Sequence, residues 1–463
     1  MDIIAMKAQR NYYKRSEIIK IKSYDVIFIT LAISNIILNY ILGINYLTYI
    51  LAMLLVIFKI RGKMSSESYL LYSLFVPNKY LQLLSILLFL VFTGELFSKK
   101  LSKLKALFVI YIFTVSTWNC LLYKGFFINV IFQVCVYFCI LRLLDEFENH
   151  FSLNLILEVF DKMFILQIIA IIIEFLITHE TMDALTGTLI SAHYLGIFLV
   201  IYAYLTWKSR FAIKRNIIFW LKLIVLILGL YFVDAKHVVF IFVFSILYSK
   251  LLSKLNIKYK LTMTMIGMTF GIALLLKLID LGALNSVIEH ISFLDIYIMN
   301  DNYNKKFQFY TNTFKQLSGI HGIFGFGVGQ YGSQICITMA KGIIYSWNSS
   351  LNGYMHAILP YINAISGIMT EWYTNTGIEI SSMVLGYPLV SYIALVAELG
   401  IVGISLFMII LDKQYRYQET TFLIMFLILT NFDTYFEIPC VLIMILVAES
   451  VNIEKMETEK SNI

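Results

Sequence analysis

The sequence predicts an all-α, polytopic membrane protein with about 12 to 14 transmembrane helices and one large extracytoplasmic loop. Of its 463 residues, 60% are hydrophobic and only 14% are charged, so the chain carries more apolar surface than one soluble core can bury. Short clusters of Lys and Arg separate the apolar runs, as in cytoplasmic loops. The net charge of +7 therefore indicates contact with a lipid bilayer rather than with nucleic acid.

The basic clusters mark one membrane face and set the direction of each crossing. They lie at residues 7–22, 59–63, 99–105, 208–215, 250–260 and 413–416. The expected helices, in chain order, are 25–41, 46–60, 106–121, 126–143, 155–177, 193–207, 216–233, 236–253, 260–279, 387–411, 419–432 and 439–450. Residues 65–97 should add a pair that turns at Pro77-Asn78-Lys79, with a first leg shorter than the roughly 20 residues of a crossing. We expect about 14 crossings if this pair spans the membrane and about 12 if it is re-entrant.

These helices divide the chain into successive parts. Residues 1–24 should form a basic cytoplasmic tail, because no small-residue cleavage site of a signal peptide follows them. Residues 25–279 form an N-terminal transmembrane bundle, and residues 280–386 form the large extracytoplasmic loop. Residues 387–450 form the C-terminal transmembrane helices, and residues 451–463 a second cytoplasmic tail.

The large loop contains the run HGIFGFGVGQYGSQI, in which Gly325, Gly327 and Gly329 alternate with apolar residues. Glycine permits positive φ and close backbone approach, which suits a turn whose amides face an anionic group. A plain structural turn is the alternative. No strand–helix pattern surrounds the run, so it does not indicate a dinucleotide site.

Lysines are disfavoured outside the membrane, yet Lys305 and Lys306 lie within the expected outer loop. Contact with a phosphate group would explain them, and pairing with the nearby Asp301 is the alternative. The aromatic residues of the same loop fit either stacking on sugar rings or an interfacial belt.

Ionisable residues also interrupt two apolar runs. Asp234, Lys236 and His237 lie at the expected outer end of a helical hairpin, where Lys236 could meet a lipid-linked diphosphate. A hairpin turn closed by an Asp–Lys pair is the alternative. Glu398 lies in the middle of an expected helix, just before Gly400, and a buried carboxylate there needs a partner.

Several catalytic classes are disfavoured. The chain has no HExxH, P-loop, CxxC or GxSxG motif, so no metal or nucleotide cofactor is expected. Its five cysteines show no disulfide framework. The candidate acids and bases of the outer loop are His321, His356, Glu371 and Glu379.

Three segments resemble the O-antigen ligase/polymerase superfamily, and most of all its Wzy-like polymerases of capsule and exopolysaccharide repeat units. They are IFGFGVGQYGS at 323–333, YPLVSYIALVAELGIVGISLF at 387–407 and DAKHVVFIFVFS at 234–245. The order and spacing of these segments are similar to the family's over nearly the whole chain. The chain departs from the family in having no arginine within residues 280–386, so lysines would have to contact the diphosphate there.

The resemblance implies a GT-C-like bundle in a bacterial cytoplasmic membrane, with both termini in the cytoplasm. It also implies glycosyl transfer on the outer leaflet, from an undecaprenyl-diphosphate-linked oligosaccharide, without a cofactor. Lys236, Lys305 and Lys306 would bind the diphosphate, and Glu398 would orient Lys236 or pack as a structural acid. A chain-length regulator and a flippase of the same pathway would be partners.

Other functions stay open. An O-antigen-type ligase would share the reaction, but the residues SSMVLGYPLVSY before the C-terminal helices lack the His-Asn pair typical of that branch. A flippase for the same lipid-linked unit would need polar residues along a central path, whereas the unusual residues noted above gather at the expected outer face. A structural or sensory protein would leave the lysines and glycines unexplained.

Overall fold

The computed structural model describes residues 22–43, 46–98, 101–122, 127–179, 185–209, 217–233, 236–280, 317, 319–329, 391–414, 420–430 and 438–460. Every regular element in these ranges is a helix, and four of the helices are long and apolar enough to cross a membrane. The prediction of a helical membrane protein is therefore confirmed. The number of crossings and the large outer loop stay predictions.

The first helices fall close to the expected ranges. They are α2 (Ser23–Leu42), α3 (Tyr46–Ile60), α4 (Ser66–Ser73), α5 (Lys79–Phe92), α6 (Glu95–Ser98), α7 (Lys103–Leu122), α8 (Phe127–His150) and α9 (Leu153–Thr178). The remaining helices are α10 (Ala192–Ser209), α11 (Ile217–Phe232), α12 (Lys236–Leu251), α13 (Ile257–Asp280), α17 (Ile320–Phe324), α22 (Ser391–Gln414), α23 (Thr421–Leu429) and α24 (Pro439–Lys460).

The expected pair within residues 65–97 is formed by α4 and α5, and its turn lies where the sequence predicts. Asn78 caps α5, because its side-chain oxygen accepts hydrogen bonds from the amides of Tyr80 and Leu81 at 3.0 and 3.1 Å. With eight residues α4 rises about 12 Å, far less than the roughly 30 Å of a hydrocarbon core. All its residues except Glu67 are buried. These features favour the re-entrant alternative for α4.

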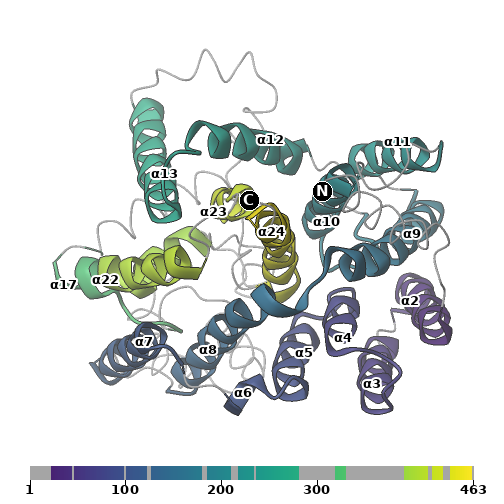
Figure 1. Ribbon diagram of the computed structural model, residues 1–463, viewed down its shortest axis with the longest axis horizontal. Coiled ribbons are helices and arrows are strands. Elements are labelled where there is room, and N and C mark those ends of the chain that lie inside the picture. Colours follow the sequence, from purple (N-terminus) through teal and green to yellow (C-terminus); the bar gives the residue numbers. More distant parts are fainter. Residues whose placement is uncertain are drawn as a thin grey trace, which may run out of the picture.

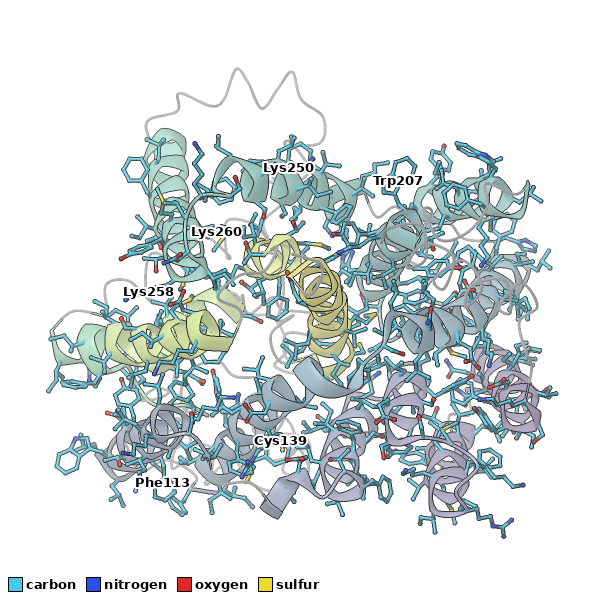
Figure 2. The ribbon with its side chains drawn as sticks, in the orientation of Figure 1. Phe113, Cys139, Trp207, Lys250, Lys258 and Lys260 are labelled. Atoms are coloured by element: carbon cyan, nitrogen blue, oxygen red, sulfur yellow. The ribbon has the colours of Figure 1, made fainter. Side chains whose placement is uncertain are left out.

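Polar contacts join helix ends that the charge pattern assigns to the same face. Lys105, at the start of α7, pairs with Asp145 near the end of α8. The amide of Lys258, which is labelled at the start of α13 in Figure 2, donates to Asp412 near the end of α22 at 3.1 Å. Two helix ends that the charge pattern assigns to the other face also meet: the hydroxyl of Tyr40, near the end of α2, donates to Glu174, near the end of α9, at 3.1 Å. The relative directions of these helices therefore agree with the predicted topology.

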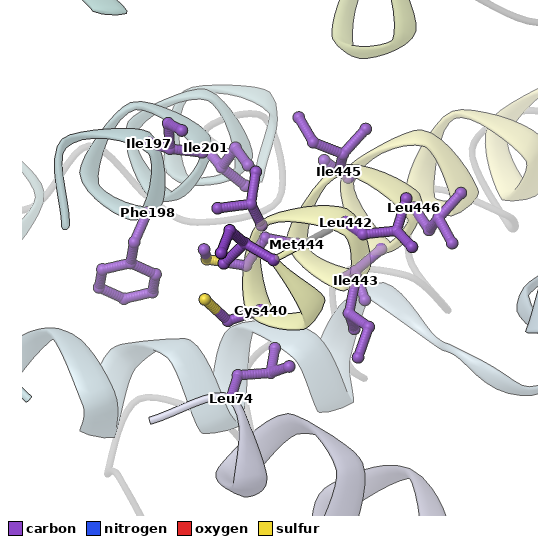
Figure 3. Close-up of a cluster of buried hydrophobic side chains, with 14 of the residues drawn as sticks. Leu74, Ile197, Phe198, Ile201, Cys440, Leu442, Ile443, Met444, Ile445 and Leu446 are labelled. Atoms are coloured by element: carbon purple, nitrogen blue, oxygen red, sulfur yellow. The ribbon is translucent and has the colours of Figure 1, made fainter. Parts of the chain in front are cut away.

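The core lies around α24, which is near the middle of the bundle and contacts α5, α8, α10 and α23 (Figure 1). Every side chain from Cys440 to Glu449 is buried, as is typical of a helix that protein surrounds on all sides. Figure 3 shows Leu74 and Phe198, from other elements, in one cluster with α24 side chains. Two helix ends lie well beyond prediction: α8 continues to His150 instead of 143, and α24 continues to Lys460 instead of 450. Neither extension includes a Gly or Pro that would end the helix.

Candidate functional site

Helix α22 is broken in the middle of its apolar run. Gly400 has φ +60° and ψ −178°, far from helical values, so α22 consists of two half-helices, 391–399 and 401–414. Such a break leaves main-chain carbonyls without their usual amide partners, which is costly at membrane depth. Glu398 lies just before the break and is 3% exposed.

The glycine run predicted to be functional satisfies two of these carbonyls. The amides of Phe326 and Gly327 donate to the carbonyls of Ala397 and Glu398 at 2.8 and 3.0 Å. The two contacting segments are far apart in the sequence, and they belong to two of the three regions that carry the family resemblance. The structure thus brings Gly327 and Glu398 together.

Close approach of the two segments depends on glycine. Gly325, Gly327 and Gly329 have φ of +76°, +87° and +76°. A Cβ on Gly325 would lie 2.3 Å from the carbonyl oxygen of Glu398, and one on Gly400 would lie 2.3 Å from the amide nitrogen of Gly325. The prediction of positive φ and close backbone approach is therefore confirmed.

The prediction that these amides face an anion is wrong for residues 325–328. Besides the two amides already described, Gly325 donates to the carbonyl of His321 at 2.8 Å. Val328 donates to the Ser116 hydroxyl at 2.7 Å. All four amides are used within the protein, so this part of the run is a structural brace for the broken helix.

A polar socket on α7 and α8 receives the brace, and sequence reasoning did not identify it. Its members are Ser116, Asn119, Asn129 and Gln133, all buried. The Asn119 amide lies 3.4 Å from the carbonyl oxygen of Gly325. A Cβ on Gly329 would lie 2.6 Å from the carbonyl oxygen of Asn129 and 3.3 Å from Gln133. In the sequence, this socket could have been recognised from polar residues spaced three or four apart within two apolar helices, because that spacing puts them on one helix face.

Tyr111, on α7, contacts main-chain carbonyls on both sides of the contact between the brace and α22. Its hydroxyl lies 2.8 Å from the carbonyl oxygen of Leu399 and 2.9 Å from that of Phe324, and its single proton is shared between them. Tyr111→Phe should therefore lower the free energy of unfolding by about 1 to 2 kcal/mol. Thermal unfolding in detergent measures this loss, and the exposed Tyr49, changed to Phe, is the control. Equal melting of both variants and wild type would contradict a role for this hydroxyl.

A second group of predicted residues lies at the start of α12. Lys236 is the first residue of this helix and is exposed. The ring of His237 packs edge-on against that of His193, at the start of α10, with centroids 4.7 Å apart and planes at 83°. His193 was not predicted, because it comes from a different helix. Asp234, the third residue predicted here, lies outside the described residues.

No family model, curated protein or solved structure matches the chain. The likeness to the O-antigen ligase/polymerase superfamily therefore rests on the three sequence segments alone.

The remaining predicted residues are placed only in part. Lys305, Lys306, His356, Glu371 and Glu379 lie outside the described residues. His321 is on α17, and its ring stacks on Phe326 with centroids 4.3 Å apart. Within the part of the chain that the structure describes, no three His, Cys, Asp or Glu side chains gather as metal ligands.

Proposed function

We propose that this chain polymerises undecaprenyl-diphosphate-linked oligosaccharide repeat units into capsular polysaccharide, exopolysaccharide or O-antigen. A hydroxyl oxygen of the acceptor unit attacks the anomeric carbon of the donor glycan. The bond from that carbon to the diphosphate oxygen breaks, and the lipid diphosphate leaves. A base takes the hydroxyl proton.

One observation supports this proposal above the others. Two of the three segments that resemble the polymerase family lie far apart in the sequence but contact each other in the fold. Gly325 and Gly327 of one segment lie against Glu398 and Gly400 of the other. The contact shows that the two segments form one structural unit, which supports treating them as parts of a single motif. Through this contact, residues 325–327 are held against the middle of α22.

The reaction assigns roles to the charged residues. Lys236 stabilises the negative charge that develops on the leaving diphosphate, with Lys305 and Lys306 as further cations. His321, His356, Glu371 and Glu379 are the candidate bases. The buried Glu398 acts as a structural acid beside the break in α22.

A flippase for the same lipid-linked unit is the second candidate, and α9 favours it. The expectation that unusual polar residues gather at one face is wrong for this helix. Lys162, Gln167 and Glu174 follow one another along α9, and all are buried. Ionisable residues at membrane depth are typical of transport paths. Here, however, Lys162 pairs with Asp25 at 2.7 Å and Glu174 accepts hydrogen bonds from a turn, so these groups also hold helices together.

Deletion of the gene in its native host, followed by sizing of lipid-linked and surface glycans, tests the function. Loss of the ladder to a single repeat unit is the expected result. Full-length polymer retained on its lipid carrier would indicate a ligase instead. Repeat units trapped on the cytoplasmic leaflet would indicate a flippase.

Lys236→Ala should lower the rate of polymer formation about a hundredfold when it replaces the wild-type gene, because the leaving diphosphate loses a cation. The matched control is Lys250→Ala, an exposed lysine at the other end of α12 (Figure 2). Ladders are compared at equal protein level. A wild-type ladder from Lys236→Ala would assign the diphosphate to other residues.

A further inference from the structure

The start of α10 is held by side chains from α9. The amides of Thr186 and Gly187 donate to one carboxylate oxygen of Glu174, at 2.9 and 2.8 Å. The amide of Thr188 donates to the side-chain oxygen of Gln167 at 2.9 Å. Glu174 is 1% exposed and Gln167 is fully buried, so three successive amides of this turn are fixed inside the protein.

Gly187 allows the turn to lie this close to α9. Its φ is +62°, and a Cβ there would lie 2.1 Å from the Gln167 side-chain oxygen. The turn leads directly into α10, where the amide of His193 donates to the Ser191 hydroxyl at 3.3 Å. The position of His193 at the start of α10 therefore follows from the contacts of α9 with the turn.

This arrangement places the ring of His193 against that of His237. The two imidazole rings are half-buried, and Lys236, which precedes His237 at the start of α12, is exposed. Among the described residues, the ring nitrogens of His193 have no hydrogen-bond partner, although the amide of the same residue is satisfied. Two imidazoles in contact, with the ammonium group of the residue before one of them, repel one another when protonated, so an anion at this end of α10 and α12 would be favoured.

We propose that His193, His237 and Lys236 form one site for a phosphate group, with His193 as a binding residue. Imidazolium and ammonium groups both donate charge-assisted hydrogen bonds to phosphate oxygens. The proposal rests on the proposed function, in which Lys236 meets the lipid diphosphate, and it adds the helix α10 to that site. The phosphate belongs either to a lipid diphosphate or to free diphosphate.

Calorimetric titration of the purified full-length chain in nanodiscs separates these sources. The probes are farnesyl diphosphate, inorganic diphosphate and farnesol. Tighter binding of farnesyl diphosphate than of inorganic diphosphate would support a lipid source, and equal binding of the two would support a site for the phosphate group alone. Farnesol binding as tightly as farnesyl diphosphate would overturn the proposal, because the phosphate would then contribute nothing.

Substitutions identify the role of His193. His193→Ala should weaken the binding of farnesyl diphosphate about tenfold or more, and His193→Gln, which keeps a similar volume, should weaken it as well. The control is His179→Asn, because His179 is exposed at the same end of α9 as Glu174 and has φ +55°, a conformation that Asn also adopts.

Gel filtration first confirms that each variant is folded. Wild-type affinity in both His193 variants, with a loss in Lys236→Ala, would overturn the role of His193 and leave the proposed function standing. Binding that depends on His193 in a chain whose deletion leaves the glycan ladder intact would instead retain the phosphate site and reject the polymerase.

Discussion

Gly325→Ala should lower the free energy of unfolding by about 3 kcal/mol. Gly325 has φ +76° and ψ 178°, a combination found essentially only in glycine, which costs about 1 to 3 kcal/mol for a residue with a Cβ. The added carbon would also lie 2.3 Å from the carbonyl oxygen of Glu398, which is main chain and cannot rotate away. Overpacking of this kind adds about 1 to 3 kcal/mol. Denaturant unfolding of the purified chain in detergent measures the sum.

Gly319 provides the matched control, because it lies in the same segment and has φ +70° but no atom within 4 Å of a Cβ position. Gly319→Ala should therefore lose only the conformational contribution, about 1 to 3 kcal/mol. The difference between the two variants isolates the contact between the brace and α22. Equal losses in both variants would show that the contact with Glu398 is absent in the folded protein.

Most helices could be predicted from the sequence, because apolar runs of membrane length have no alternative but to form helices. The run 106–121 became α7, with bounds Lys103 and Leu122. The turn before α5 was also predictable, since Pro77 and Asn78 have local effects on the backbone. The end of α24 was predicted too early, because the charge pattern marks the membrane surface and not the end of hydrogen bonding.

The break in α22 could not be predicted in the same way. Gly400 lies in an otherwise regular apolar run, and a single glycine is tolerated in a membrane helix. What makes the break stable is the supply of donors from residues 326–327 and from Tyr111. These partners come from distant parts of the chain, so no local pattern around Gly400 reveals them.

The candidate site shows the same limit. Lys236 and His237 were predicted because charges interrupt two adjacent apolar runs. His193 has no such signal, since a single His at a helix start is common and its meaning depends on the packing of α10 on α12. The polar residues of α9 were visible within the expected helix 155–177, but only their partners on other helices show what they do.

The Asp25–Lys162 pair should produce the second large effect. Lys162 lies 2.7 Å from a carboxylate oxygen of Asp25, and the two residues are 3% and 0% exposed. Lys162→Met should lower the free energy of unfolding by about 3 to 5 kcal/mol, because it leaves a buried carboxylate without its cation. The hydroxyl of Tyr72 and the amide of Lys22 still donate to Asp25, but neither neutralises the charge. Unfolding in detergent at fixed pH measures the loss.

Two further variants distinguish a buried ion pair from simple packing. The double variant Asp25→Asn/Lys162→Met removes both charges and should recover much of the stability, because no unpaired charge then remains buried. Lys222→Met is the matched control: its pair with Asp161, also 2.7 Å long, has side chains 26% and 22% exposed, so about 1 kcal/mol is expected. If the single Lys162 and Lys222 variants lost equal stability, or the double variant lost the sum of its parts, burial of the charge would not be the cause. Recovery in the double variant would instead show that α2 and α9 require matched charges, whichever function the outer face performs.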